Sequence, residues 1–411
     1  MLSHSVEEGP LVNRFRACWD ELAPVGRDAG SGGYLRYAFT PPELRLRDWF
    51  RDQAAARGMA LTEDGNGNLF AWWGDPGTGD AGSDGAILTG SHFDSVPHGG
   101  AYDGPLGIVS AFLAIDELRA AGMAPARPVG VAAFVEEEGG RFGVPCLGSR
   151  LFAGAIDPDR AAALTDAAGT TFAAALGRRP AGARPDLLGN LGGYVELHVE
   201  QGRALAEVGA PVGVASAIWP HGRWRLEFTG EANHAGTTRM ADRRDPMLTY
   251  AFTVLAANKE ARLRGAHATV GRVRVEPNAT NAIPSRVTGW LDARAAEPET
   301  LTELVAALRT KAAERARRDG TELVVVEESA TPPVAFDTDL GARLARLLAA
   351  PALPTAAGHD AGVLAGHVPT AMLFVRNPTG VSHSPAEAAG DADCAAGVRA
   401  LAEVLAELAC R

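Results

Sequence analysis

Residues 129–138 read Val-Gly-Val-Ala-Ala-Phe-Val-Glu-Glu-Glu. The first seven are almost all apolar, which is typical of a strand buried on both faces in the centre of a parallel sheet. The three carboxylates that follow repel one another and are costly to desolvate unless cations neutralise them. Taken alone, they also fit a solvated acidic loop. The stretch therefore predicts an α/β fold and identifies a strand end at which a cation site is possible.

The segment from residue 86 to residue 121 has the pattern of strand, loop and helix. The run Ala-Ile-Leu-Thr at 86–89 leads into Gly-Ser-His-Phe-Asp-Ser at 90–95 and Gly-Gly-Ala-Tyr-Asp-Gly at 99–104. Apolar residues then recur at helical spacing. Ligands of open α/β sheets bind beyond the carboxyl ends of the strands. The histidine and the two aspartates of this loop are therefore candidate site residues.

Two further strands bring histidines to the same kind of position. Residues 194–200, Tyr-Val-Glu-Leu-His-Val-Glu, alternate, so that His198 and the glutamates share one face. Residues 370–375 form an apolar run, and Gly-Val-Ser-His-Ser-Pro-Ala-Glu follows at 380–387. A single histidine on a strand is more often a core residue than a ligand. These histidines therefore support a metal site only when they are considered together.

Two metal ions would explain this set of histidines and carboxylates. In an extended chain His92 and Asp94 point the same way, which predicts that the Asp94 side chain orients His92. Asp103, placed between glycines, could bridge two ions. Three histidines, one aspartate and one glutamate, without cysteine, are typical of a two-metal hydrolase that uses zinc or manganese. His359, followed by Asp360, is expected to support the site or face the substrate.

Between residues 224 and 328 the pattern changes to the β-α-β-β-α-β order of a ferredoxin-like unit. The predicted elements are 224–229, 245–264, 269–275, 286–293, 297–319 and 321–326. We therefore predict a catalytic α/β metal-binding domain, residues 1–213 and 332–411, interrupted by a smaller domain, residues 214–331. The hinges are expected near Gly213 and Pro332.

The inserted segment carries three candidate substrate-binding residues. His234 lies in Gly-Glu-Ala-Asn-His-Ala-Gly-Thr-Thr, Asn281 in Pro-Asn-Ala-Thr-Asn-Ala-Ile-Pro, and Arg294 in Asp-Ala-Arg. Each also has a structural explanation, because asparagines suit turns and Arg294 can pair with Asp292.

Composition limits the possible partners and location. A chain of 411 residues exceeds what one hydrophobic core organises, so two domains are expected. A net charge of −11 disfavours nucleic acid, and no apolar run is long enough for a bilayer. Residues 1–8 lack the features of a secretion signal, and the four cysteines form no C-x-x-C pair. We expect a cytoplasmic protein with reduced cysteines.

The motifs together resemble a known family. They are GSHFDS, GGAYDG, EEEGGRF, ELHVEQG, HAGTT, PNATNAIP, DAR and GVSHSPAE, and they extend from about Leu88 to Ala388. The chain resembles the hydantoinase/carbamoylase branch of the zinc-dependent aminoacylase and carboxypeptidase superfamily. That branch includes N-carbamoyl-L-amino-acid hydrolases, β-ureidopropionases and allantoate amidohydrolases. The resemblance implies hydrolysis of a ureido C–N bond in a small carboxylate substrate, with release of ammonia and CO2.

The resemblance also implies a ligand set. One divalent ion would be held by His92, Asp103 and His198, and the other by Asp103, Glu138 and His383. Zinc or manganese, or else cobalt, would be the metal.

The family pattern assigns further roles. Glu137 matches the general base, and His234 matches the residue that polarises the scissile carbonyl. Asn281 and Arg294 match the residues that bind the substrate carboxylate, and Gln201 lies near the substrate. The resemblance implies that the inserted domain is a lid that also pairs two subunits into a homodimer, with His234 acting in its own site or in its partner's.

Three residues depart from the family pattern. Tyr102 replaces a phenylalanine, Glu136 replaces a neutral residue, and Arg239 replaces a proline. The last two leave the substrate preference open.

Two other interpretations remain. A dipeptidase or aminoacylase on the same scaffold would share the metal loop, but those branches usually carry an acidic residue in place of His198 and lack the ELHVEQG stretch. An inactive interaction protein would keep the fold, yet every predicted ligand and Glu137 are present.

Overall fold

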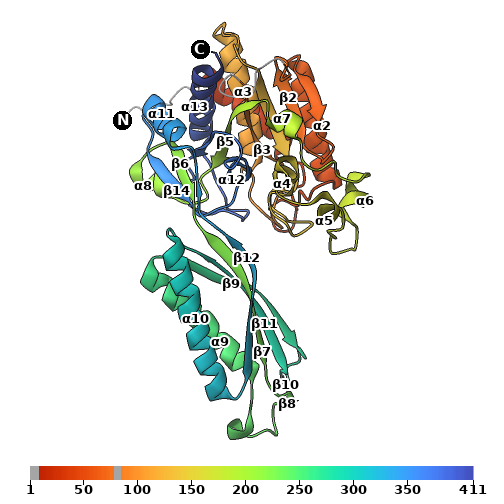
Figure 1. The fold of residues 1–411 in the computed structure, drawn as a ribbon, viewed down its shortest axis with the longest axis vertical. Helices are drawn as coiled ribbons and strands as arrows, with labels where there is room; N and C mark the ends of the chain where they lie inside the picture. Colours follow the sequence, from red (N-terminus) through yellow and green to blue (C-terminus); the bar gives the residue numbers. More distant parts are fainter. Residues whose placement is uncertain (1–8, 78–84, 411) are drawn as a thin grey trace, which may run out of the picture. The chain divides into compact units, whose positions relative to one another are not determined.

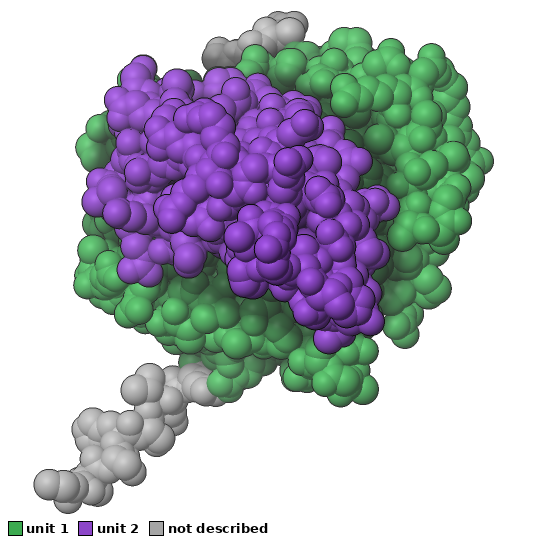
Figure 2. All heavy atoms as spheres, turned by 90° about the horizontal axis from the view of Figure 1, so that it is seen from below, with its two compact units in different colours: residues 1–217, 335–411 green, residues 218–334 purple. Residues whose placement is uncertain are grey.

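A computed structural model of the chain describes residues 9–77 and 85–410, and Figure 1 shows its fold. The chain divides into two compact units, Met1–Ala217 with Ala335–Arg411 and Ile218–Val334 (Figure 2). The expected hinge at Gly213 lies inside a strand, where this residue pairs with Phe374. The division therefore falls slightly later than predicted. Residues 1–8, in which no secretion signal was predicted, lie outside the described residues.

The larger unit is built on a mixed sheet with the strand order β1-β2-β4-β3-β5-β15-β6-β13, and β14 pairs with β6. Its four central strands, β4, β3, β5 and β15, are parallel to one another, as the apolar run at 129–135 predicted. The outer strands β2 and β6 run antiparallel to their neighbours. The strands are β1 (Ala60–Glu63), β2 (Leu69–Trp73), β3 (Ala86–His92), β4 (Val129–Phe134), β5 (Leu191–Val199), β6 (Val212–Ile218), β13 (Val334–Ala335), β14 (Ala352–Thr355) and β15 (Thr370–Val375).

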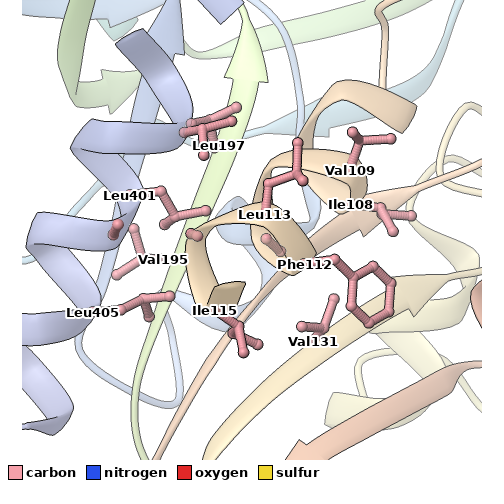
Figure 3. Close-up of a cluster of buried hydrophobic side chains, with 14 of the residues drawn as sticks. Ile108, Val109, Phe112, Leu113, Ile115, Val131, Val195, Leu197, Leu401 and Leu405 are labelled. Carbon is pink, nitrogen blue, oxygen red and sulfur yellow. The ribbon is translucent and has the colours of Figure 1, made fainter. Parts of the chain in front are cut away.

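Helices α3 (Pro105–Ala120) and α13 (Asp391–Ala409) pack against the central strands and against each other. Figure 3 shows Val195 and Leu197 of β5 facing Leu401 of α13 and Leu113 of α3. Helix α3 is apolar on almost all sides, as expected of a helix that is buried all round. Helix α13 and the sheet together cover it. These contacts form the core that fixes the strand ends.

The remaining helices of this unit are shorter or lie further from the parallel strands. The alanine-rich segment 157–185 forms short helices. Helix α8 is also short. Glu200, which follows β5, accepts hydrogen bonds from the N–H groups of Ala204 and Leu205 at the start of this helix. These helices are α1 (Pro10–Leu22), α2 (Pro41–Ala56), α4 (Leu147–Ala153), α5 (Pro158–Ala162), α6 (Phe172–Leu176), α7 (Pro185–Leu188), α8 (Ala204–Val208), α11 (Thr338–Leu348) and α12 (Asp360–Leu364).

The smaller unit is an antiparallel sheet with the order β12-β7-β11-β9, covered on one face by two helices (Figure 1). Alternate residues of β7, Trp224, Leu226 and Phe228, pack against the helices. The main elements follow one another as predicted, and β8 pairs with β10 in a separate ribbon. They are β7 (His221–Thr229), β8 (Asn233–His234), the short helix η1 (Met240–Asp242), α9 (Pro246–Arg264), β9 (His267–Glu276), β10 (Ala282–Ile283), β11 (Arg286–Arg294), α10 (Pro298–Asp319) and β12 (Glu322–Thr331).

Among the described residues, no helix combines the length and the apolar composition that crossing a membrane would require.

Candidate functional site

The carboxyl ends of the four parallel strands meet at one edge of the sheet. His92 ends β3 opposite Phe134 of β4, and the acidic loop 136–138 follows directly. His198 near the end of β5 lies opposite Phe374 of β15. Because parallel strands end at the same edge, residues far apart in the sequence converge there, as the strand-end argument predicted.

Five side chains form two potential ligand groups that share one carboxylate. The groups are His92, Asp103 and His198, and Asp103, Glu138 and His383. Oδ1 of Asp103 lies 3.5 Å from Nε2 of His92 and 3.2 Å from Nε2 of His198. Oδ2 lies 3.4 Å from Nε2 of His383. Each oxygen of Asp103 thus faces a different group, which is the arrangement expected of a bridging ligand.

Several atoms of these groups have no hydrogen-bond partner although they are buried. They are Nε2 of His92, Nε2 of His198 and Oε1 of Glu138. Buried polar atoms nearly always have a partner, so atoms without one point to a missing ligand. In residues 9–77 and 85–410, the ion-pair partners of Asp103 and Glu138 are histidines rather than lysine or arginine. The donor set therefore fits divalent cations.

The titration behaviour reflects the same crowding. Burial, followed by the charge of Asp103, raises the pKa of Glu138 to about 7. Burial would lower the pKa of His383, but Asp103 and Glu138 outweigh it and raise this pKa to about 9. Burial would raise the pKa of Asp103, but the neighbouring imidazoles of His198, His383 and His92 outweigh it and hold this pKa well below its usual range. Negative charge is thus in excess at the site.

The two buried histidines are oriented by backbone carbonyls. Nδ1 of His92 lies 3.0 Å from the carbonyl oxygen of Asp94, and Nδ1 of His198 lies 2.9 Å from that of Val199. Each Nε2 is left to face Asp103, as in histidines that bind metals.

The predicted contact between the Asp94 side chain and His92 is present as an ion pair, with Oδ1 of Asp94 3.7 Å from Nδ1 of His92, and the backbone carbonyl supplies the hydrogen bond. The chain leaves the extended conformation after His92, so the alternation assumed from the sequence does not continue. The Asp94 carboxylate also accepts hydrogen bonds from the N–H groups of Glu137 at 3.1 Å and Glu138 at 3.0 Å. Asp94 therefore fixes the acidic loop.

Glu137 lies beside the ligand groups with a buried carboxyl. Its Oε2 is 3.7 Å from Nε2 of His92, and its Oε1 accepts a hydrogen bond from Sγ of Cys146 at 3.3 Å. Burial is the main cause that raises the pKa of Glu137 well above its ordinary value. A raised pKa makes the carboxylate a stronger base, which suits a group that accepts a proton. No sequence signal identified Cys146 as its partner.

Gln201 and His359 also lie at the site. Nε2 of Gln201 donates to Oδ2 of Asp103 at 2.9 Å and lies 3.2 Å from Nε2 of His383. The ring of His359 lies 4.5 Å from that of His198, and both of its nitrogens are buried without a partner. Burial lowers its pKa well below the usual value, so the ring is neutral.

A third possible ligand group, Glu196, His198 and His359, competes with the first. Nδ1 of His198 is engaged by a backbone carbonyl, so both groups need its Nε2. Glu196 instead accepts hydrogen bonds from Ser91 Oγ at 3.1 Å and from the N–H of Ala361 at 2.9 Å. It belongs to the support behind the site.

Glu136, which departs from the family pattern, is occupied by its own loop. Its Oε1 accepts hydrogen bonds from the N–H groups of Arg141 and Phe142. Arg141 in turn pairs with Asp166 of the segment 157–185. These contacts hold the loop that carries Glu137.

The three candidates of the smaller unit are not brought together within one chain. His234 pairs with Ala282, and the carbonyl of Asn281 accepts the N–H of Ala235, so these two candidates are neighbours. Arg294 ends β11, where its Nε donates to Asp292 at 2.8 Å. At about 3.4 Å per residue, β11 separates the two ends by about 27 Å. Asn281 and Arg294 of one chain therefore lie too far apart to contact the same small carboxylate, and their joint role in binding it stays a prediction.

Comparisons with known proteins give a consistent result. The model of "Peptidase family M20/M25/M40" matches residues 88–407. An N-carbamoyl-L-amino acid amidohydrolase of Geobacillus stearothermophilus is 37% identical, covering 95% of this chain and 96% of its own length. An allantoate amidohydrolase of Escherichia coli (strain K12) is 33% identical, covering 97% and 99%. A solved hydantoinase/carbamoylase family amidase from Burkholderia vietnamiensis is 31% identical, with a TM-score of 0.87 and complete coverage of both chains.

Cation binding should become weaker as the pH falls, because His383 and Glu138 must lose their protons to act as ligands. Their pKa values of about 9 and about 7 place this competition in the neutral range. Calorimetric titration with Zn²⁺ in buffers of different ionisation enthalpy should detect proton release at neutral pH. Equal affinity from pH 6 to pH 9 (about three decades of proton concentration), without proton release, would contradict the ligand assignment.

Proposed function

The chain belongs to peptidase family M20/M25/M40, and from this premise we propose that it hydrolyses the ureido C–N bond of a small carboxylate. The substrate class is that of N-carbamoyl-L-amino acids and allantoate, with ammonia and CO2 as products. The observation that carries the proposal is the pair of ligand groups sharing Asp103, with Glu137 beside them. The amidohydrolases that match nearly the whole chain support the substrate class.

Two divalent cations complete the proposed site, with zinc or manganese preferred and cobalt as a substitute. His92, Asp103 and His198 would hold one, and Asp103, Glu138 and His383 the other. When bound, two such ions would neutralise the carboxylates and act as Lewis acids that activate water.

Glu137 is the proposed general base and acid. Its Oε2 would take a proton from the attacking water and deliver it to the departing ureido nitrogen. Asp94 keeps this carboxyl in place through the backbone of the acidic loop, and the thiol of Cys146 restrains its other oxygen. Gln201 and the neutral His359 are proposed to contact the substrate.

The smaller unit supplies the remaining proposed contacts. The His234 imidazole would stabilise negative charge on the scissile carbonyl, as hydrogen-bond donors do in acyl transfer. The planar guanidinium of Arg294 suits the substrate carboxylate, for which this acidic chain needs a local positive charge. All the proposed ligands lie in the larger unit, so the ferredoxin-like insert is proposed to act as a lid that joins these groups to them.

A homodimer with shared sites is the proposed assembly. Because Asn281 and Arg294 of one chain are too far apart to bind one small substrate, Arg294 of one subunit would work with His234 and Asn281 of the partner subunit. Helix α9 also presents exposed apolar side chains at helical spacing, which is unusual for a free surface. They are Leu248, Phe252, Leu255 and Leu263.

The proposed location is the cytoplasm, and nucleic acid and membranes are not expected as partners. All four cysteines are free, which fits a reducing compartment.

The activity should be limited to ureido carboxylates. We expect ammonia release from N-carbamoyl-L-amino acids or allantoate, and no amino-acid release from dipeptides. An uncharged carboxamide analogue should react about 30-fold more slowly, because a charge-assisted contact contributes about 2 kcal/mol. A steady-state substrate panel with zinc, manganese and cobalt measures this. Faster cleavage of dipeptides would indicate the dipeptidase alternative, and no hydrolysis at all would support an inactive protein.

Glu137→Gln should keep the fold and the metals but lose about 10²–10⁴-fold in turnover, since the amide cannot accept the proton. Glu136→Gln is the matched control, because the neighbouring carboxylate serves the loop backbone, and its turnover should remain close to that of the unmodified enzyme. Turnover and metal content are measured on the same samples. Near-normal turnover of Glu137→Gln would remove this residue from the mechanism.

Mixing two inactive variants, His234→Ala and Glu137→Gln, should restore activity if His234 works across the dimer. Each hybrid then contains one complete site, and random exchange should give about a quarter of the unmodified activity. The measurement is turnover after subunit exchange, with exchange verified by mass spectrometry of differently tagged chains. No recovery despite proven exchange would place His234 in the site of its own chain.

A further inference from the structure

Glu387 connects two loops at the candidate site, although it is not a member of either ligand group. Its Oε1 accepts hydrogen bonds from the N–H of Tyr102 at 2.9 Å and of Asp103 at 3.0 Å. Its Oε2 accepts a hydrogen bond from Oγ of Ser382 at 3.0 Å. One carboxylate thus joins the backbone of the shared ligand Asp103 to the residue before the ligand His383.

The fit around this carboxylate is tight. Glu387 is buried, and a Cβ atom added at Gly100 would overlap its side chain. Only a glycine at that position lets the 99–104 loop lie against Glu387. Tyr102 stacks on Trp19 of α1 with ring centroids 4.7 Å apart, which holds the other side of the same loop. The backbone of Asp103 is therefore fixed from two directions.

The two ligand groups differ in how their histidines are held. His92 and His198 belong to strands of the central sheet, and their side chains are 1% exposed. His383 lies on a loop, adopts a left-handed backbone conformation with φ of 54°, and has a side chain that is 49% exposed. The sheet fixes the first group, whereas the second group depends on contacts between loops.

We propose that Glu387 is a positioning residue that sets the spacing between Asp103 and His383, and thereby the cation affinity of the Asp103, Glu138 and His383 group. The proposal rests on the proposed two-metal function. Glu387 touches neither reacting atoms nor the cation in this role. It acts as an acceptor for three donors, so the number and placement of its hydrogen bonds matter more than its charge.

The test is the metal affinity of the full-length chain, measured by titrating the chelator-treated protein with Co²⁺ and following its absorption spectrum. The unmodified chain should bind two ions. Glu387→Ala should bind the first ion normally and the second about 10–100-fold more weakly, as expected when a group that orients metal ligands is lost. Ser382→Ala removes one of the three donors and should weaken the same ion to a smaller degree.

Glu387→Gln separates positioning from charge. Its amide oxygen can still accept both N–H groups, and the Ser382 hydroxyl can turn to accept from the amide nitrogen. The second affinity should therefore stay close to that of the unmodified chain. A loss as large as that of Glu387→Ala would show that charge is what matters and would overturn the proposal. Unchanged affinity in Glu387→Ala would also overturn it.

Asp337→Asn is the control for general destabilisation. Its carboxylate also accepts a backbone N–H, from Leu340 at 2.8 Å at the start of α11, away from the ligand loops. Both affinities should be unchanged in this variant. If Asp337→Asn lowered the affinity for the second ion as much as Glu387→Ala does, the proposal would be overturned. If the unmodified chain bound fewer than two ions, the two-metal function itself would fail, whereas failure of the Glu387 variants alone would leave that function intact.

Discussion

The crowding of carboxylates around Asp103 is the constraint on which the rest of the site depends. Asp103 is 5% exposed and faces three histidines, and Glu137 and Glu138 lie beside it with raised pKa values. Such a concentration of negative charge in a dry environment is unfavourable without cations. The fold tolerates it because backbone N–H groups satisfy the surrounding carboxylates, as with Asp94. The loops around the site are held by these hydrogen bonds, while the negative charge of the carboxylates is left for cations to neutralise. This combination is expected of a metal site.

Most of the scaffold could be predicted from local patterns, because buried parallel strands and amphipathic helices have distinct periodicities. The central strands, α3, α9 and α10 all follow from them. Helices α1 and α13 were not predicted. Helix α13 is mostly apolar and alanine-rich, so neither a clear stripe nor strong end signals identify it. The two units divide at Ala217, slightly after the expected hinge at Gly213, because β6 continues across the division and no local pattern marks it.

The candidate site was predictable as a set of residue types and less so as a set of contacts. The ligand residues follow strand ends, which a sequence reveals. That Asp94 contacts His92 through its carbonyl, or that Cys146 reaches Glu137, depends on where the chain leaves the extended conformation, which no periodicity encodes. The distance between Asn281 and Arg294 likewise follows from the length and direction of β11, although their motifs are close in sequence.

Strand β5 couples the chemistry of this protein to its folding. Val195 and Leu197 face the apolar core (Figure 3). The alternate residues Glu196 and His198 face the candidate site. A slip of one residue in the pairing of β5 with β3 would exchange the two faces. It would then place a glutamate and a histidine among the leucines of α3 and α13. The two polar residues of β5 at the candidate site therefore also penalise a misaligned pairing, so the same side chains that build the site help to set the register of the strand.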